Sequence, residues 1–204
     1  MGSVRPIREE SAPPVPFDSQ AIDNLRFIRR AMESSVAFTA VPGKGGAAMG
    51  VSALIAAVLA NRQTSPERWL AVWIAEAAVA LGLGIYGARL KSQHQVGPSL
   101  ARPARKFVVA LLPSLLAGSL LTVILFRAGL WRDLPAAWLL IYGMGVLAGG
   151  VFSVRVVPIM GLCFLALGTC AVFTPPGWGN GWLALGFGAV QIFFGIVIAR
   201  RFGG

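Results

Sequence analysis

The chain has 204 residues, of which 56% are hydrophobic and 13% are charged. Its mean hydropathy of +0.71 is typical of a chain solvated largely by lipid and excludes an ordinary soluble domain. The formal net charge of +10 does not indicate nucleic-acid binding, because the basic residues flank apolar segments and form no stripe on a polar domain. We therefore expect membrane lipids, and not nucleic acid, as the anionic partners.

The N-terminal region divides into two parts. Residues 1–18 are rich in proline and mixed charges without periodicity, which predicts a disordered cytoplasmic tail. Residues 19–40 place apolar side chains at helical spacing and predict an amphipathic helix. Arg26, Arg29 and Arg30 lie on its polar face, where we expect them to contact the membrane surface. A second interpretation, that this helix packs across the cytoplasmic ends of the bundle, fits the pattern equally well.

Apolar segments dominate the rest of the chain, and each is near the length that crosses hydrocarbon. They cover 46–60, 69–88, 107–126, 135–154, 156–174 and 182–199. The first segment is the shortest of the six. The predicted fold class is therefore all-α: a polytopic membrane helical bundle of six transmembrane helices within residues 46–200, preceded by the amphipathic interfacial helix.

The distribution of lysine and arginine orients these spans. If the N-terminus is cytoplasmic, the cytoplasmic segments hold 14 of the 18 basic residues, and the opposite loops hold Arg62, Arg68, Arg127 and Arg132. A ratio of 14 to 4 indicates that both termini are cytoplasmic in a multi-pass protein.

The even-numbered spans share a pattern, because each has a Trp-Leu pair at or near its outer end (Trp69, Trp138, Trp182) and an arginine directly after its inner end. One interpretation is an old duplication of three helical hairpins. The other is that tryptophan favours membrane interfaces and arginine favours cytoplasmic ends. We favour the second, since the odd-numbered spans show no convincing repeat.

Small residues recur at four-residue intervals in several spans, as in the pairs Gly46 with Gly50 and Gly145 with Gly149. Such spacing lets helix backbones approach closely in lipid. Packing explains these glycines better than function does.

Glu76 is the one acidic side chain inside a predicted span. An ionised carboxylate is costly in hydrocarbon unless it is paired or hydrated, so Glu76 is expected to face protein or water. In a structural role it is either neutral or bonded to Arg127, Arg132, Gln191 or a serine hydroxyl; in a functional role it is a proton or cation site. We favour the structural role, because a proton pathway needs several relay groups.

Glu76, Gln191 and Arg127 are the expected members of an intramembrane polar site. Gln191 lies at a depth comparable to that of Glu76, so a bond between them would tie the second and sixth spans together.

The sequence offers no catalytic constellation, cofactor motif or metal-ligand set. The single histidine, His94, is expected in a cytoplasmic loop. We therefore do not expect an enzyme.

Residues 22–50 carry a family resemblance. An amphipathic Asp-Asn-Leu-Arg-Phe-Ile-Arg helix (23–29) precedes Phe-Thr-Ala-Val-Pro-Gly (38–43), and this arrangement resembles small uncharacterised bacterial polytopic inner-membrane proteins. The resemblance implies the inner (plasma) membrane of a bacterium and no particular activity.

Two functions remain open from the sequence. The first is a non-enzymatic accessory, assembly or sensor subunit that associates with lipids, protein partners or further copies of itself. The second is a small transporter or channel with Glu76 and Gln191 on a polar path.

Overall fold

The computed structural model describes residues 22–26, 28, 43–94 and 101–202. The chain divides into two units, 1–36 and 37–204. In the first unit the described residues are helical, and Arg26 forms an ion pair with Asp23 at 3.6 Å. The predicted tail and the rest of the predicted amphipathic helix, including Arg29 and Arg30, lie outside the described residues.

Most of the described part of the second unit is helical, and no strand occurs among its described residues. The long ones are α2 (Gly43–Asn61), α3 (Pro66–His94), α4 (Ala101–Arg127), α5 (Leu134–Gly150) and α6 (Val156–Val172). The last segment consists of α7 (Gly179–Leu183), the π-helical η3 (Ala184–Val190) and α8 (Gln191–Phe202), and the short 3-10 helices η1 (Trp131–Asp133) and η2 (Pro176–Trp178) precede α5 and α7. The predicted all-α helical bundle is confirmed.

Five helical segments are long and apolar enough to cross a membrane. They are Gly43–Asn61, Pro66–Leu90, Arg105–Arg127, Trp131–Gly150 and Pro176–Phe202. The sixth apolar segment, α6, has 17 residues, which at 1.5 Å per residue is about 25 Å and shorter than a typical hydrocarbon core.

Helix α3 extends beyond its predicted apolar stretch, 69–88, at both ends. Helix α3 begins at Pro66, where the Ser65 hydroxyl accepts a hydrogen bond from the backbone N–H of Arg68 (3.3 Å) and caps the first turn. The same helix continues through His94, four residues past the apolar span, which ends at Leu90. A helix satisfies its own backbone bonds and can therefore extend past the apolar stretch into polar sequence.

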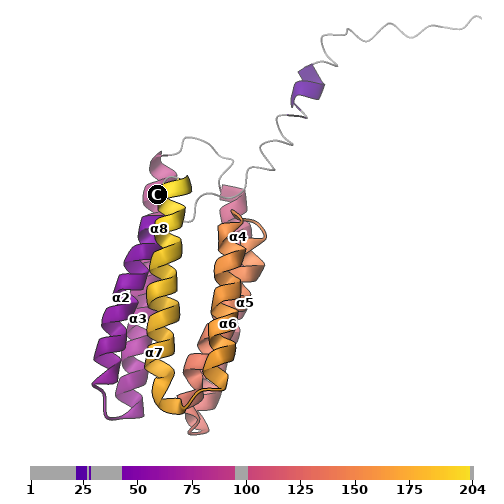
Figure 1. Cartoon of the computed structure of the whole chain (residues 1–204). Helices are drawn as coiled ribbons and strands as arrows, with labels where there is room; N and C mark the ends of the chain where they lie inside the picture. The colour runs from indigo at the N-terminus through magenta and orange to yellow at the C-terminus, as the bar shows by residue number, and fades with distance from the viewer. Residues whose placement is uncertain (1–21, 27, 29–42, 95–100, 203–204) are drawn as a thin grey trace, which may run out of the picture. The chain divides into compact units, whose positions relative to one another are not determined.

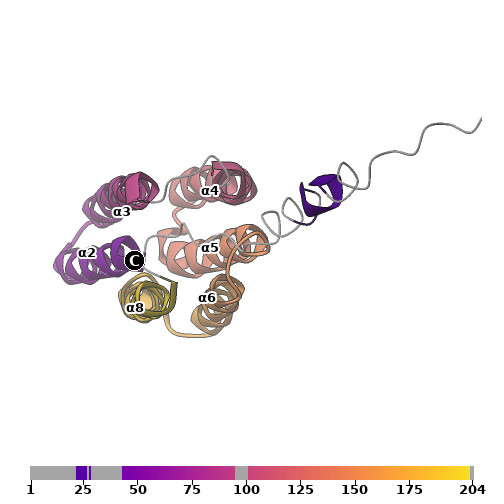
Figure 2. The same cartoon turned by 90° about the horizontal axis from the view of Figure 1, so that it is seen from above.

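The helices run alongside one another (Figure 1), and their order in cross-section follows the contacts between them. Helix α2 lies between α3 and α8, and α5 lies between α4 and α6 (Figure 2). The two groups of three meet mainly through α7 and η3, which contact helices of both groups.

The two ends of this bundle differ in composition. We call one the tryptophan end; it contains the connections 62–65, 128–130 and 173–175. We call the other the arginine end; it contains the turn 151–155 and the C-terminal turn of α8 with Arg200 and Arg201.

Glycines set the closest helix contacts. A Cβ atom at Gly50 of α2 would lie 2.7 Å from the carbonyl oxygen of Gly188, and one at Gly161 of α6 would lie 2.7 Å from the backbone nitrogen of Leu147. Backbone cannot move aside as a flexible side chain can, so these positions require glycine. Gly145 and Gly149 likewise receive side chains of α4.

The centre of the bundle is aromatic. Tyr142 of α5, Phe164 of α6 and Phe187 of η3 pack edge to face or tilted, with ring centroids 4.8–5.4 Å apart. Phe164 is completely buried. This cluster joins the last segment to α5 and α6.

Candidate functional site

The tryptophan end gathers all six tryptophans of the chain. Trp69, which begins the second predicted span, stacks on Trp138, which lies in the first turn of the fourth, with ring centroids 5.6 Å apart and an interplanar angle of 7°. Trp131 packs at a tilt against Trp69 at 5.5 Å. Rings from α3, η1 and α5 therefore form one cluster between the two groups of helices.

Asn180 of α7 connects this cluster to the last segment. The indole N–H of Trp69 donates to its side-chain oxygen at 2.7 Å, and the indole N–H of Trp73 donates to the same oxygen at 3.2 Å. Both tryptophans are buried. Because an indole N–H is a donor and never an acceptor, the two contacts fix which side of the Asn180 amide faces the rings.

Two threonines form similar ties. The indole N–H of Trp138 donates to the hydroxyl of Thr122 (2.8 Å), and that of Trp182 donates to the hydroxyl of Thr174 (2.7 Å). Each hydroxyl in turn donates to a backbone carbonyl three or four residues earlier in the chain. Both hydroxyls therefore accept one hydrogen bond and donate another, so they are satisfied within the protein.

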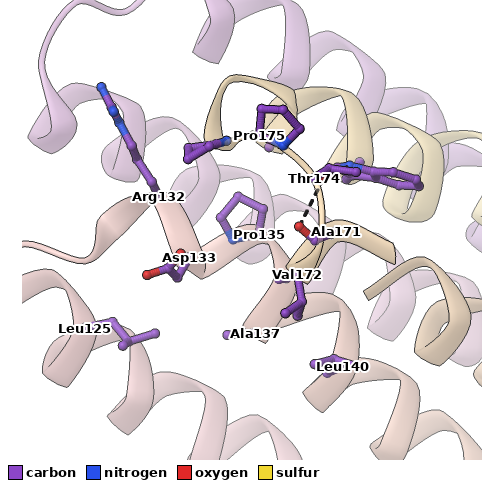
Figure 3. A pocket seen from close by; sticks show the side chains of 14 residues that line it. Leu125, Arg132, Asp133, Pro135, Ala137, Leu140, Ala171, Val172, Thr174 and Pro175 are labelled. Atoms are coloured by element: carbon purple, nitrogen blue, oxygen red, sulfur yellow. Dashed lines mark hydrogen bonds between the residues drawn. The ribbon is translucent and has the colours of Figure 1, made fainter. Parts of the chain in front are cut away.

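Two adjoining cavities open at this end. The smaller, about 280 Å³, lies between α5 and the connection after α6 and is lined by Leu125, Asp133, Thr174 and Trp182 among others (Figure 3). The larger, about 330 Å³, is lined by residues 63–65, Trp69, Trp131 and Asn180 among others. Arg132 lines both cavities, and its guanidinium lies over the Trp131 ring at 5.4 Å from the centroid.

Glu76 lies on the face of α3 that contacts α2. The hydroxyl of Ser52 donates to its carboxylate at 2.8 Å, and the Ser52 oxygen is also 2.8 Å from the carbonyl oxygen of Met49. Glu76 is partly buried, and it lines neither of the two cavities. Of the partners considered from the sequence, a serine hydroxyl is the one that the structure provides.

Gln191 lies elsewhere. Gln191 is 7% exposed and its side chain forms a hydrogen bond with Tyr142, while its oxygen Oε1 has no hydrogen-bond partner among the described residues. It is the first residue of α8, immediately after the π-helical turn.

The structure does not bring the expected polar site together. The predicted bond between Glu76 and Gln191 is wrong, because α2 lies between the helices that carry them. Arg127 is the exposed last residue of α4 at the tryptophan end. Depth along a helix is readable from sequence, but the identity of the neighbouring helix is not.

Sequence reasoning missed Asn180, Trp73, Thr122 and Thr174. The signal that points to them is chemical: a tryptophan buried in a bundle needs an acceptor for its N–H. Hydroxyl or amide side chains near the same end are the candidates for that acceptor.

Among the residues that the structure describes, no three His, Cys, Asp or Glu side chains come together where they would hold a metal ion. Comparisons with models of protein families, with curated proteins and with solved structures returned no match.

Proposed function

We propose that this membrane protein is a non-enzymatic accessory, assembly or sensor subunit that acts by associating with lipids or with other protein chains. The observation that carries the proposal is how the polar groups of the bundle are used. Ser52 bonds to Glu76 across α2 and α3, Thr122 bonds to Trp138 across α4 and α5, and Asn180 bonds to Trp69 across α7 and α3. Each contact ties two elements locally, whereas a transport path needs polar groups in series.

The outer faces of α3 and α4 support association as well. In the most apolar stretch of 18 residues, 11% of the residues are buried in α3 and likewise in α4. The corresponding stretches of the other three long spans have 33–50% of their residues buried. Leu81 and Leu120 are among the large apolar side chains that these two helices leave exposed. In a bilayer such faces contact acyl chains or the helices of a further chain.

The orientation follows from charge. We place both termini in the cytoplasm of a bacterium, because 14 of the 18 lysines and arginines then lie on the cytoplasmic side. The tryptophan end then faces away from the cytoplasm.

The test compares the wild-type chain with Glu76→Gln in proteoliposomes, with proton and cation flux measured by entrapped dyes and thermal unfolding measured in detergent. Glutamine keeps an oxygen that accepts from Ser52 and removes the ionisable group. We expect both chains to show the flux of protein-free vesicles and to unfold at similar temperatures.

The contrary result is wild-type flux that Glu76→Gln abolishes while the unfolding temperature is unchanged. That outcome would contradict the proposed function and would indicate a transporter or channel with Glu76 on its polar path.

A further inference from the structure

The larger cavity at the tryptophan end is lined by hydrogen-bonding side chains and by aromatic rings. Arg132, Asn180, Thr64 and Gln63 line it together with Trp69 and Trp131, and no carboxylate is among its described lining residues. Its volume of about 330 Å³ lies at the lower end of the range for small-molecule sites. Asp133, the neighbour of Arg132 in the chain, lines the adjoining cavity.

Asn180 supplies donors to this cavity. Its oxygen accepts from the indole N–H groups of Trp69 and Trp73, so the NH₂ group occupies the other side of the amide. This orientation does not depend on a choice between two equivalent amide positions, because a reversed amide would set two donors against two donors. Among the described residues, none accepts a hydrogen bond from the NH₂ group of Asn180, which lines the cavity.

Arg132 supplies the charge. Its guanidinium lies over the Trp131 ring, 5.4 Å from the centroid, and carries N–H donors in a planar fork. Planar N–H pairs of this kind match the oxygens of a phosphate or carboxylate.

The surroundings favour an anion too. The described residues of the tryptophan end include four arginines (62, 68, 127 and 132) and two acidic residues (Glu67 and Asp133), an excess of two positive charges. A cluster of tryptophans of this kind is typical of the headgroup level of a membrane.

We propose that this cavity binds a phosphate-bearing group, which the Arg132 guanidinium and the Asn180 NH₂ group contact while the Trp131 and Trp69 rings form its wall. A phosphate is preferred to a carboxylate because donors approach from two separate elements, η1 and α7, and a tetrahedral group offers oxygens to both. The group is either the headgroup of an anionic phospholipid or a free phosphate ester. Phosphate-bearing lipids or esters would then be the class of ligand with which the protein associates. This inference rests on the proposed function, because that function places the tryptophan end at a membrane surface.

The experiment measures tryptophan fluorescence of the full chain in a phosphate-free maltoside detergent, because the tryptophans lie at this end. Two matched pairs of probes are titrated: sn-glycerol 3-phosphate against glycerol, and dioctanoyl phosphatidylglycerol against dioctanoylglycerol. Variants are Arg132→Gln and Asn180→Asp. The aspartate keeps an oxygen for the two indoles and replaces the NH₂ group by a negative oxygen. Arg127→Gln is the control, since Arg127 lies at the same end and lines neither cavity.

We expect a saturable change with a phosphorylated probe and none with its unphosphorylated match. Because charge-assisted contacts are lost, the Kd should rise about tenfold or more in Arg132→Gln and in Asn180→Asp and stay within about twofold in Arg127→Gln. Binding of the lipid alone identifies a headgroup site, and binding of both phosphorylated probes identifies a site open to free esters.

Absence of any saturable response in a folded wild-type chain overturns the proposal, as does a response that persists in both cavity variants at an unchanged unfolding temperature. Failure here is distinct from failure of the proposed function. Flux through Glu76 would remove the latter while leaving phosphate binding intact.

Discussion

The two halves of the bundle hold their helices together by different means. At the tryptophan end, large side chains bridge the elements through rings and hydrogen bonds, as Trp69 and Trp73 do with Asn180. From the middle of the bundle to the arginine end, glycines place backbone against backbone, as Gly50 does with Gly188. Rings that bridge a wide gap leave space beside them, and both cavities described above lie at the tryptophan end. The fold therefore provides room for a ligand at one end and close packing at the other.

The strongest disruption of the tryptophan end is Asn180→Leu. It leaves two buried indole N–H groups without an acceptor, and at about 1–3 kcal/mol for each orphaned donor we expect a loss of about 3 kcal/mol in the free energy of unfolding. Thermal unfolding in detergent measures this loss. Asn180→Asp, which keeps the acceptor oxygen, should lose much less, and equal losses in the two variants would contradict the role given to that oxygen.

In the glycine-packed region, Gly161→Ala is expected to cost about 2 kcal/mol, because the added methyl group overlaps the backbone of Leu147 and overpacking typically costs about 1–3 kcal/mol. The matched control is Gly82→Ala in α3, where no atom of the described part of the chain lies within 4 Å of the new Cβ atom. That control should be neutral or slightly stabilising because alanine favours helix over glycine. Similar melting temperatures for the two variants would mean that α5 and α6 are not in backbone contact.

A smaller effect is expected for Trp138→Phe. The variant keeps most of the ring stacked on Trp69 and removes the hydrogen bond to Thr122, so the loss should be about 1 kcal/mol, that of one net hydrogen bond. Chemical unfolding monitored by circular dichroism measures it. A loss several times larger would show that the ring area, and not the N–H group, is what Trp138 contributes.

Hydropathy and charge predict much of this fold from sequence. The apolar stretches predict the helices, and interfacial preference predicts that Trp69, Trp138 and Trp182 share one end. Glycine spacing predicts close contact, which Gly50 and Gly145 make. Each of these features depends on the type of a residue and on its position along its own helix, and both can be read from the sequence.

The depth of a residue in the membrane does not show which helices are neighbours. Glu76 and Gln191 belong to helices on opposite sides of α2, and this arrangement cannot be read from the sequence. The π-helical turn η3 and the partnership of Asn180 with Trp69 and Trp73 likewise depend on packing between elements distant in the chain. The amphipathic helix with Arg26, Arg29 and Arg30 remains a prediction.

The central claim is that polar groups inside the bundle tie neighbouring helices together, and a double-mutant cycle on Ser52 and Glu76 tests it most directly. Ser52→Ala, Glu76→Ala and the double variant are compared with the wild type by thermal unfolding in the same detergent. Since the two side chains share a hydrogen bond of 2.8 Å, we predict a coupling free energy of about 0.6–1 kcal/mol. Additive losses, with a coupling of zero, would contradict the account.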